Sequence, residues 1–274
     1  MARRRSFLYV PGGEERKVRK APTIGADVVV LDLEDAVPPG MKGEARRLLS
    51  KLLGELEWRG ELCVRVNPLW SGEGVKDLEH VARWDPVSCV VVPKAEPGLS
   101  VLAYRATGRS VVPLIETPRG VVRLEDVVRE EGVVAVTWGP ADLALSVGGR
   151  LEAYSRSVCV RTWVALAAHA YGVDPIDSVY FRVDDVEGYR REALEAKSLG
   201  YVGKSAIHPR QVEVANEVFT PTREEVEWAR RVVEAYESAA ARGAGALKVE
   251  GELVDAVHYR IARRILEAAK PEES

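Results

Sequence analysis

Carboxylates follow two neighbouring apolar runs of the sequence and could share one metal ion. Glu116 ends the run VVPLIE, and Asp142 comes shortly after the run VVAVTW. If both runs are strands, their carboxylates can meet around one hard cation, and Mg²⁺ typically takes one or two carboxylates together with water and substrate oxygens. We therefore predict a Mg²⁺ site at Glu116 and Asp142 that also suits Mn²⁺. The alternative is that each acid caps a helix, because a proline typical of a helix start lies beside each.

Arg65 lies near the end of another apolar run, LCVRVN. Its planar guanidinium suits bidentate binding of a carboxylate or of a developing enolate. The sequence DLED places three acids on four residues, Asp32, Glu34 and Asp35. We predict that Glu34 and Asp35 support Arg65 and the waters of the metal. The alternatives are a structural ion pair between Arg65 and one of these two acids, and a turn position for Asp35.

Several cations could bind an anionic substrate. Lys94 ends the run CVVVPK, Lys204 and His208 lie around the run VGKSAI, and Arg5 precedes the Pro-Gly-Gly of residues 11–13. We predict all four as substrate contacts, with phosphate the target of Arg5 and Lys204. His208 has no second histidine nearby, which argues against zinc. A lone histidine of this kind is more often a hydrogen-bonded structural residue.

The runs that carry these residues predict the fold. They are continuous rather than alternating, as expected for parallel strands buried on both faces, and lie at 7–10, 27–33, 62–67, 89–94, 111–116, 133–138, 178–181 and 202–207. Helical patterns between them include 42–56, 156–172 and 188–200. Eight strand–helix repeats predict a TIM (β/α)₈ barrel. An open doubly wound sheet is the second choice, because the first strand is not followed by the G-x-G-x-x-G fingerprint.

The barrel is expected to span residues 1–219 and to be followed by a C-terminal helical extension at 220–274. Residues 220–243 have a helical pattern, the turn-like GAGALKVEGEL comes next, and VDAVHYRIARRILEAA predicts a final helix. The extension is too short for an independent domain. It could cover the bottom of its own barrel or reach a neighbouring subunit.

Composition narrows the class of protein. Of the 274 residues 46% are hydrophobic and 30% charged, and the net charge of −3 with scattered basic residues argues against nucleic acid as a partner. Cys63, Cys89 and Cys159 are far apart and are interpreted as buried thiols rather than a disulfide frame. No apolar stretch approaches the ~18 residues of a membrane span, and MARRRSFLYVPGG lacks a signal-peptide core. We expect a cytoplasmic protein without a membrane partner.

Taken together, these segments resemble the citrate lyase β-subunit-like group of the HpcH/HpaI aldolase superfamily, which includes malyl-CoA and citramalyl-CoA lyases. The resemblance covers most of the chain, and DLEDAV with IET and GKSAIHPRQV is a specific combination. The matching segments are RRSFLYVPGG, DVVVLDLEDAVPPGMKGEAR, VRVNP, VVPKAE, PLIETPRG, WGPADL and LGYVGKSAIHPRQV.

The resemblance implies a TIM barrel with a divalent metal on Glu116 and Asp142 and with CoA over the strand ends. Arg65 would contact the substrate carboxyl or thioester oxygen. In the CoA lyases of this group, an acid on the C-terminal extension enters the active site of a neighbouring subunit, and GELVDAVHYRIA gives Asp255 that role. The proline usually found two residues later is Val257 here. A homotrimer or homohexamer is the implied assembly.

The predicted activity is Mg²⁺-dependent cleavage of a short 3-hydroxyacyl-CoA thioester, such as a citryl, malyl, citramalyl or methylmalyl thioester, into an acyl-CoA and an α-keto acid. One alternative is a malyl-CoA thioesterase. Another is a citrate lyase β-subunit that acts on an acyl-carrier-protein thioester. The segment GKSAIHPRQV argues against a CoA-independent aldolase, because HpcH-type aldolases lack that pattern.

Overall fold

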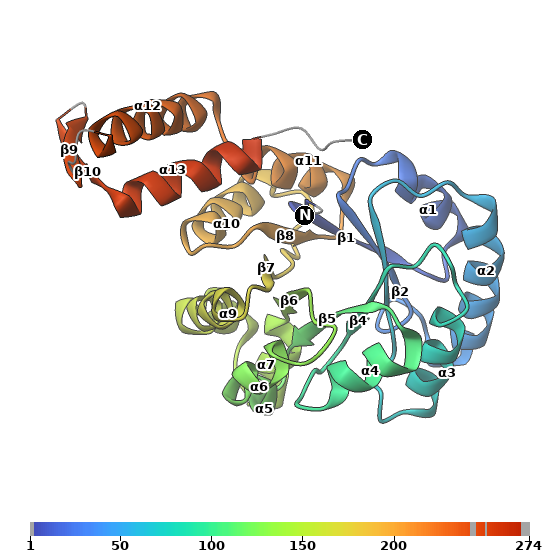
Figure 1. Ribbon diagram of the computed structural model, residues 1–274. Helices are drawn as coiled ribbons and strands as arrows, with labels where there is room; N and C mark the ends of the chain where they lie inside the picture. The colour runs from blue at the N-terminus through green and yellow to red at the C-terminus, as the bar shows by residue number, and fades with distance from the viewer. Residues whose placement is uncertain (1–2, 242–244, 250, 270–274) are drawn as a thin grey trace. The chain divides into compact units, whose positions relative to one another are not determined.

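Short runs of β-branched residues form eight parallel strands in the computed structural model (Figure 1). Neighbours pair in chain order from β1 to β8, and β8 pairs with β1, so the sheet closes into a barrel. The predicted TIM barrel is therefore confirmed. The strands are β1 Ser6–Pro11, β2 Val28–Asp32, β3 Glu61–Arg65, β4 Cys89–Val92, β5 Ser110–Ile115, β6 Ala135–Trp138, β7 Asp174–Asp177 and β8 Gly203–Ala206.

Helices connect the strands and form the outer layer of the barrel (Figure 1). Two short 3₁₀ helices, Ala21–Thr23 and Pro39–Met41, complete the connections. The α-helices are α1 Glu15–Lys20, α2 Lys42–Glu55, α3 Gly72–Val81, α4 Leu99–Thr107, α5 Pro118–Val122, α6 Leu124–Val128, α7 Pro140–Ser146, α8 Leu151–Ser155, α9 Val158–Ala170, α10 Val186–Ser198 and α11 Pro209–Val218.

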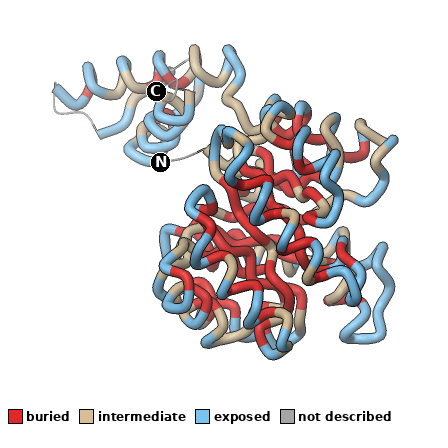
Figure 2. Tube along the Cα trace, turned by 90° about the vertical axis from the view of Figure 1, so that its right-hand side faces the viewer, coloured by how far each residue is buried: buried red, intermediate tan, exposed pale blue. Residues whose placement is uncertain are grey.

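Each strand packs on both of its sides because successive side chains point in opposite directions. In β2, Val28 and Val30 belong to the cluster that fills the inside of the barrel. Val29 and Leu31 belong to the outer cluster, which includes Leu49 of α2. Figure 2 shows the same division, with buried strands inside and exposed residues on the outer turns of the helices. The strand ends are therefore held on a rigid scaffold.

The seventh strand is displaced from its predicted position. The prediction placed it at 178–181, whereas β7 is Asp174–Asp177, and Ile176 of that strand pairs with Gly203. The run SVYF has high β propensity, while the two acids and the proline of DPID argue against a strand. Tertiary contacts reverse this preference, because the buried Asp177 carboxylate binds Arg161 and Lys204.

The structure describes residues 3–241, 245–249 and 251–269. The chain divides into two compact units, Met1–Phe219 and Thr220–Ser274. No helix in the described part of the chain is both long and apolar enough to span a bilayer.

The second unit consists of α12 Arg223–Ala240, β9 Ala246–Val249, β10 Glu252–Asp255 and α13 Ala256–Ala269. Thr222 and Glu225 form a capping box that starts α12. The stretch predicted as a turn is an antiparallel hairpin, in which Leu247 pairs with Val254. Gly243 of that stretch lies outside the described residues. Val254 packs with both helices, which gives the hairpin a small core of its own.

Cys63 and Cys89 form a disulfide, and Cys159 is exposed. The prediction of three buried thiols is therefore wrong. Cys63 of β3 and Cys89 of β4 are direct neighbours in the parallel register, and both are fully buried. They are 26 residues apart in the chain, a spacing that a strand–helix–strand unit bridges but that resembles no disulfide motif.

Reduction of this disulfide is expected to lower the free energy of unfolding by about 3 kcal/mol, because the cross-link closes a loop of intermediate length in the unfolded chain. Denaturant unfolding with and without a strong reductant, equilibrated from the unfolded side, measures the difference. Cys159→Ser, which keeps the cross-link, is the matched control and should respond to reductant as the wild type does. An unfolding midpoint insensitive to reductant would contradict the expectation.

Candidate active site

A cavity of about 810 Å³ opens among the carboxyl ends of the barrel strands. Its walls include Asp32 at the end of β2, Arg65 at the end of β3, Glu116 after β5 and Asp142 after β6. In barrels of this kind the carboxyl end of the strands is the catalytic end. The structure thus brings both predicted metal ligands and the predicted substrate arginine into one cavity.

Neither Glu116 nor Asp142 caps a helix. The side chain of Thr117 caps α5 by accepting the Gly120 N–H, and α7 has Gly139 as its N-cap residue and no side-chain cap. Gly139 leaves room for the Glu116 side chain, because a Cβ at residue 139 would lie 2.5 Å from Glu116 Oε2. Both carboxylates are therefore available to the cavity, and the helix-cap alternative is wrong.

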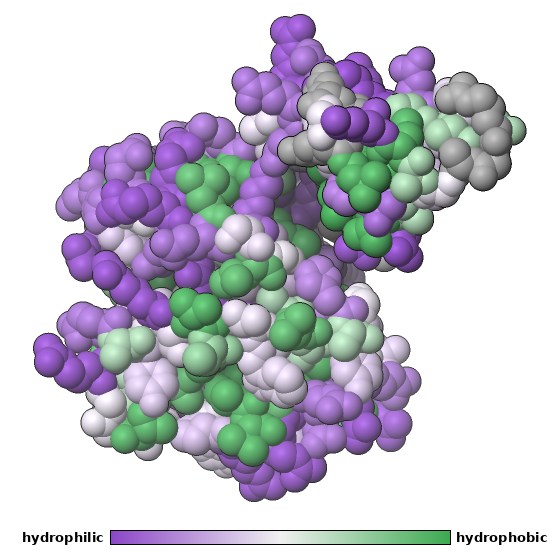
Figure 3. Space-filling view, turned by 90° about the vertical axis from the view of Figure 1, so that its left-hand side faces the viewer, coloured by the Kyte–Doolittle hydropathy of each residue, from purple (hydrophilic) through white to green (hydrophobic). Residues whose placement is uncertain are grey.

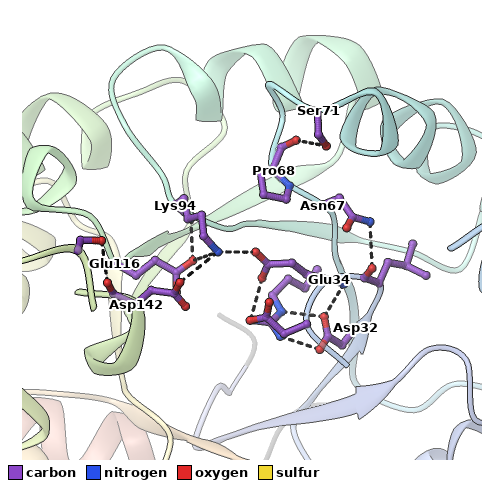
Figure 4. A network of polar contacts seen from close by, with 12 residues as sticks. Asp32, Glu34, Asn67, Pro68, Ser71, Lys94, Glu116 and Asp142 are labelled. Carbon is purple, nitrogen blue, oxygen red and sulfur yellow. Dashed lines mark hydrogen bonds and ion pairs between the residues drawn. The ribbon is translucent and has the colours of Figure 1, made fainter. Parts of the chain in front are cut away.

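Lys94 lies among three carboxylates (Figure 4), and two of these, Glu116 and Asp142, line the cavity. Its Nζ is 2.7 Å from Glu34 Oε1, 3.5 Å from Asp142 Oδ1 and 3.7 Å from Glu116 Oε1. Its backbone N–H also donates to Glu116 Oε1 over 2.8 Å. Lys94 has a positive φ of 50°, a conformation that costs a non-glycine residue energy and that these contacts hold in place.

The electrostatics of this cluster favour an additional cation. Burial, followed by the negative charge of Glu34, raises the pKa of Glu116 to about 8. Burial alone would lower the pKa of Lys94, but the hydrogen bond that its Nζ donates to Glu34 and the charges of the surrounding carboxylates raise it. One ammonium group thus faces three acids. The buried carboxylate oxygens, with Asp142 on the same wall, fit a hard divalent ion such as Mg²⁺.

Arg65 is held in a fixed orientation by acids of the DLED segment. Its Nε and Nη2 donate to the two oxygens of Asp32 over 2.8 and 2.6 Å. Its Nη1 lies 3.1 Å from Glu34 Oε2, and its guanidinium lies 5.3 Å from the centroid of the Tyr9 ring. Burial raises the pKa of Tyr9, which keeps its hydroxyl protonated. The Arg65 side chain is only 13% exposed, and it lines the cavity.

The two supporting acids are placed differently. Glu34 bridges Arg65 and Lys94 and therefore joins the two halves of the site. Asp35 is 63% exposed and lies 3.7 Å from Arg65 Nη1 at the edge of the cavity. The main partner of Arg65 is Asp32, which the sequence placed at a strand end without giving it this role.

Arg5 and Lys204, which were predicted to contact phosphate, lie outside the cavity. Arg5 precedes β1, at the amino end of the barrel, and binds both carboxylate oxygens of Asp27. Its closeness to residues 11–13 in sequence is misleading, because the intervening strand crosses the whole barrel at ~3.3 Å per residue. Lys204 is fully buried, and its Nζ donates to Asp177 over 2.6 Å. Neither side chain reaches the cavity.

His208 is the N-cap of α11, and its Nδ1 accepts the Arg210 N–H over 3.2 Å. It also lines the cavity. The structure adds three basic residues to this rim, Arg16, Lys17 and Lys20 of α1. The basic run ERKVRK, which starts one residue after the Pro-Gly-Gly turn, is a sequence signal that could have identified them.

The family model described as HpcH/HpaI aldolase/citrate lyase matches residues 5–209. The chain belongs to this family. A second family model, described as a C–C bond lyase of the TIM-barrel fold, matches residues 152–271, which include the whole described part of the second unit. The family is thus one of carbon–carbon lyases, and its models cover the strand ends that carry the cavity as well as the C-terminal extension.

Relatives of this family with known activities differ in the reaction assigned to them. The mitochondrial citramalyl-CoA lyase of Rattus norvegicus is 32% identical over 97% of this chain and 86% of its own length. The (3S)-malyl-CoA thioesterase of Cereibacter sphaeroides is 33% identical over 97% of this chain and 94% of its own length. A solved structure of the family, CitE of Mycobacterium tuberculosis in complex with magnesium, acetoacetate and coenzyme A, aligns with a TM-score of 0.83 at 33% identity, over 96% of this chain and 97% of that chain.

Asp255, predicted as the acid of the extension, ends β10 and starts α13. Its Oδ1 accepts the Val257 N–H over 2.8 Å and the His258 N–H over 3.2 Å, as a helix cap does. The hydrogen bond from the His258 ring lowers the pKa of Asp255. Asp255 thus has a structural role within its own unit, and its catalytic role stays a prediction.

Proposed function

We propose that the protein is a Mg²⁺-dependent lyase that cleaves a short 3-hydroxyacyl-CoA thioester into an acyl-CoA and an α-keto acid. The observation that carries this proposal is the cavity in which the carboxylates of Glu116 and Asp142 lie together with the oriented guanidinium of Arg65. A carboxylate pair suits a cation and an acid chelated by it, while an arginine suits the oxyanion that forms when the carbon–carbon bond breaks.

The reaction breaks one carbon–carbon bond and, in net terms, moves one proton from the hydroxyl oxygen to the α carbon. The bond between the α carbon of the thioester and the carbon that bears the hydroxyl breaks, the hydroxyl loses its proton, and its carbon becomes the keto carbon. The electron pair goes to the α carbon and forms the enolate of the acyl-CoA, which a proton then converts to the product. A bound magnesium ion would supply Lewis-acid polarisation of the oxygen that becomes the keto group.

Arg65 is suited to the enolate half of this reaction. Asp32 fixes the guanidinium through two hydrogen bonds, and Glu34 lies beside Nη1. The remaining N–H groups are then pre-oriented, so no reorganisation is needed when negative charge appears on the thioester oxygen. Lys94 adds a second positive charge behind the cavity wall, and Glu34 contacts both cations.

The rim is suited to the CoA part of the substrate. Arg16, Lys17 and Lys20 of α1 line the cavity and offer cations to phosphate groups, and His208 of α11 lines it as well. The coenzyme A and magnesium in the related Mycobacterium tuberculosis structure support this assignment. We propose these residues as the CoA contacts in place of Arg5 and Lys204.

We further propose that the active form is a homotrimer or homohexamer in which Asp255 acts on the active site of a neighbouring subunit. Leu253, Val257 and Ile261 are 68%, 50% and 47% exposed and surround Asp255 in the chain. Figure 3 shows separate hydrophobic areas on the face of the barrel unit that carries α9, and Trp163 and Leu166 of that helix are 44% and 61% exposed. Exposed apolar surfaces of this kind favour protein–protein contacts.

A panel of thioesters tests the proposed function. Citryl-, malyl-, citramalyl- and methylmalyl-CoA are incubated with the purified protein and Mg²⁺, and α-keto acid and CoA species are quantified. We expect equal amounts of keto acid and acyl-CoA from at least one thioester, and no reaction after chelation of the metal. Free CoA without keto acid would instead assign a thioesterase. Activity only with an acyl-carrier-protein thioester would assign a citrate lyase β-subunit.

A further inference from the structure

Thr137 is a buried polar residue whose hydroxyl is unused by the fold. The residue is 1% exposed, and its Oγ1 has no hydrogen-bond partner among the residues that the structure describes. It also lines the cavity of the active site. Because a buried hydroxyl without a partner destabilises the folded state, a position that retains one calls for a physical reason.

The register of the barrel places Thr137 below the proposed metal ligands. Thr137 of β6 pairs with Leu114 of β5, and Leu114 points to the same side of its strand as Glu116 two residues later. Ala135 belongs to the cluster inside the barrel, while Val136 and Trp138 pack outward. Thr137 therefore points inward, one layer deeper than Glu116.

Other hydroxyl groups lie around the same part of the cavity. Tyr9 of β1 and Ser205 of β8 both line it, and β1 and β8 are neighbours in the barrel. Burial raises the pKa of Tyr9, so its hydroxyl remains a hydrogen-bond donor at neutral pH. The inner end of the cavity thus presents neutral donors, whereas the charged groups surround it nearer the mouth. Neutral donors suit the oxygen atoms of an acid that is already held by a cation.

We propose that the Thr137 hydroxyl donates a hydrogen bond to an oxygen atom of the acid portion of the substrate, the part that becomes the α-keto acid. This inference rests on the proposed function and extends it to the inner end of the cavity. The fold retains the unsatisfied hydroxyl because the bound acid satisfies it. Ser100 provides the contrast, since its Oγ is also buried without a described partner but lies on α4, away from the cavity.

Three variants test the inference by ligand binding and by thermal unfolding. Thr137→Val keeps the shape and removes the donor, Thr137→Ser keeps the donor, and Ser100→Ala removes an orphan hydroxyl elsewhere. Titration calorimetry with oxaloacetate and with pyruvate, each in the presence of Mg²⁺, gives the Kd of the keto acid. The comparison uses whichever of the two keto acids binds the wild type more tightly. For that acid we expect Thr137→Val to raise Kd roughly 10- to 100-fold. The Kd of Thr137→Ser should stay within a few-fold of the wild-type value, and the Kd of Ser100→Ala should equal it.

The unfolding temperature separates this role from a structural one. Because Thr137→Val removes an unsatisfied polar group at constant volume, its unfolding temperature should equal or exceed that of wild type. Weaker binding together with a lower unfolding temperature would assign the hydroxyl to the fold and overturn the inference. Unchanged binding in Thr137→Val, with an active wild type, would overturn it while leaving the proposed function intact. A wild type that binds neither keto acid and cleaves none of the thioesters would overturn both.

Discussion

Glu116→Gln and Asp142→Asn are each expected to reduce Mg²⁺-dependent cleavage by a factor on the order of 10³, the scale of losing a preorganised group that stabilises charge. Each variant removes one carboxylate charge from the wall of the cavity while keeping the size of the side chain. The remaining acids then balance Lys94 and Arg65 but no longer attract a dication. Steady-state kinetics at increasing Mg²⁺ concentration, with calorimetric titration of Mg²⁺, measure the loss.

The same variants should fold normally, which separates a metal role from a structural one. Glu116 is 3% exposed and feels the negative charge of Glu34. The neutral amide of Glu116→Gln therefore removes the repulsion between these two carboxylates. Glu79→Gln is the matched control, because Glu79 lies on α3 in an exposed ion pair with Arg83 and the chemical change is identical. Wild-type metal affinity and turnover in both cavity variants would contradict the metal assignment, whatever the stability.

The barrel itself could be predicted from the sequence because parallel strands buried on both faces give continuous apolar runs. The one misplaced strand shows the limit of that signal. DPID is a strand because the carboxylate of Asp177 finds Arg161 and Lys204 within the folded barrel. The partners come from α9 and β8, so the stabilising contacts of β7 are absent from any local window of sequence. The Cys63–Cys89 disulfide was missed for the same reason, because the two cysteines become neighbours only in the register between β3 and β4.

The site was predictable to the extent that strand ends could be recognised. Glu116, Asp142 and Arg65 each lie at or just after the carboxyl end of a strand, and the closed barrel brings such ends together. Which partner each side chain takes depends on three-dimensional register, so Asp32 rather than Asp35 holds Arg65. Thr137 carries no signal in the sequence, since its importance lies in an unsatisfied hydroxyl that only the packed barrel reveals.

Chains that carry either Arg65→Ala or Asp255→Asn are expected to be nearly inactive alone and to regain activity when they assemble together. Arg65 belongs to the barrel cavity, whereas Asp255 belongs to the second unit and is proposed to act on a neighbouring subunit. A mixed oligomer then contains sites with an intact arginine from one chain and an intact acid from the other. With random assembly of equal amounts, about a quarter of the sites in a closed symmetric ring should be complete.

The asparagine substitution makes this experiment specific for the acid. Asp255 caps α13 through Oδ1, and asparagine caps helices as well as aspartate does, so the helix and its exposed stripe Leu253, Val257 and Ile261 are retained. Alanine at residue 255 would remove the proposed proton donor and the helix cap together, so a loss of activity could not be assigned to either. Circular dichroism and size-exclusion chromatography of each variant establish that fold and assembly are kept.

Co-expression of the two chains with different affinity tags, followed by sequential purification, isolates the mixed oligomers. The two homo-oligomers mixed after separate assembly serve as the control and should stay inactive, because no site in them combines both intact residues. If the co-assembled sample is also inactive, Asp255 acts on the barrel of its own chain. If Asp255→Asn alone retains wild-type kcat/KM, the carboxylate serves only to cap α13, and the proton that reaches the enolate comes from another group.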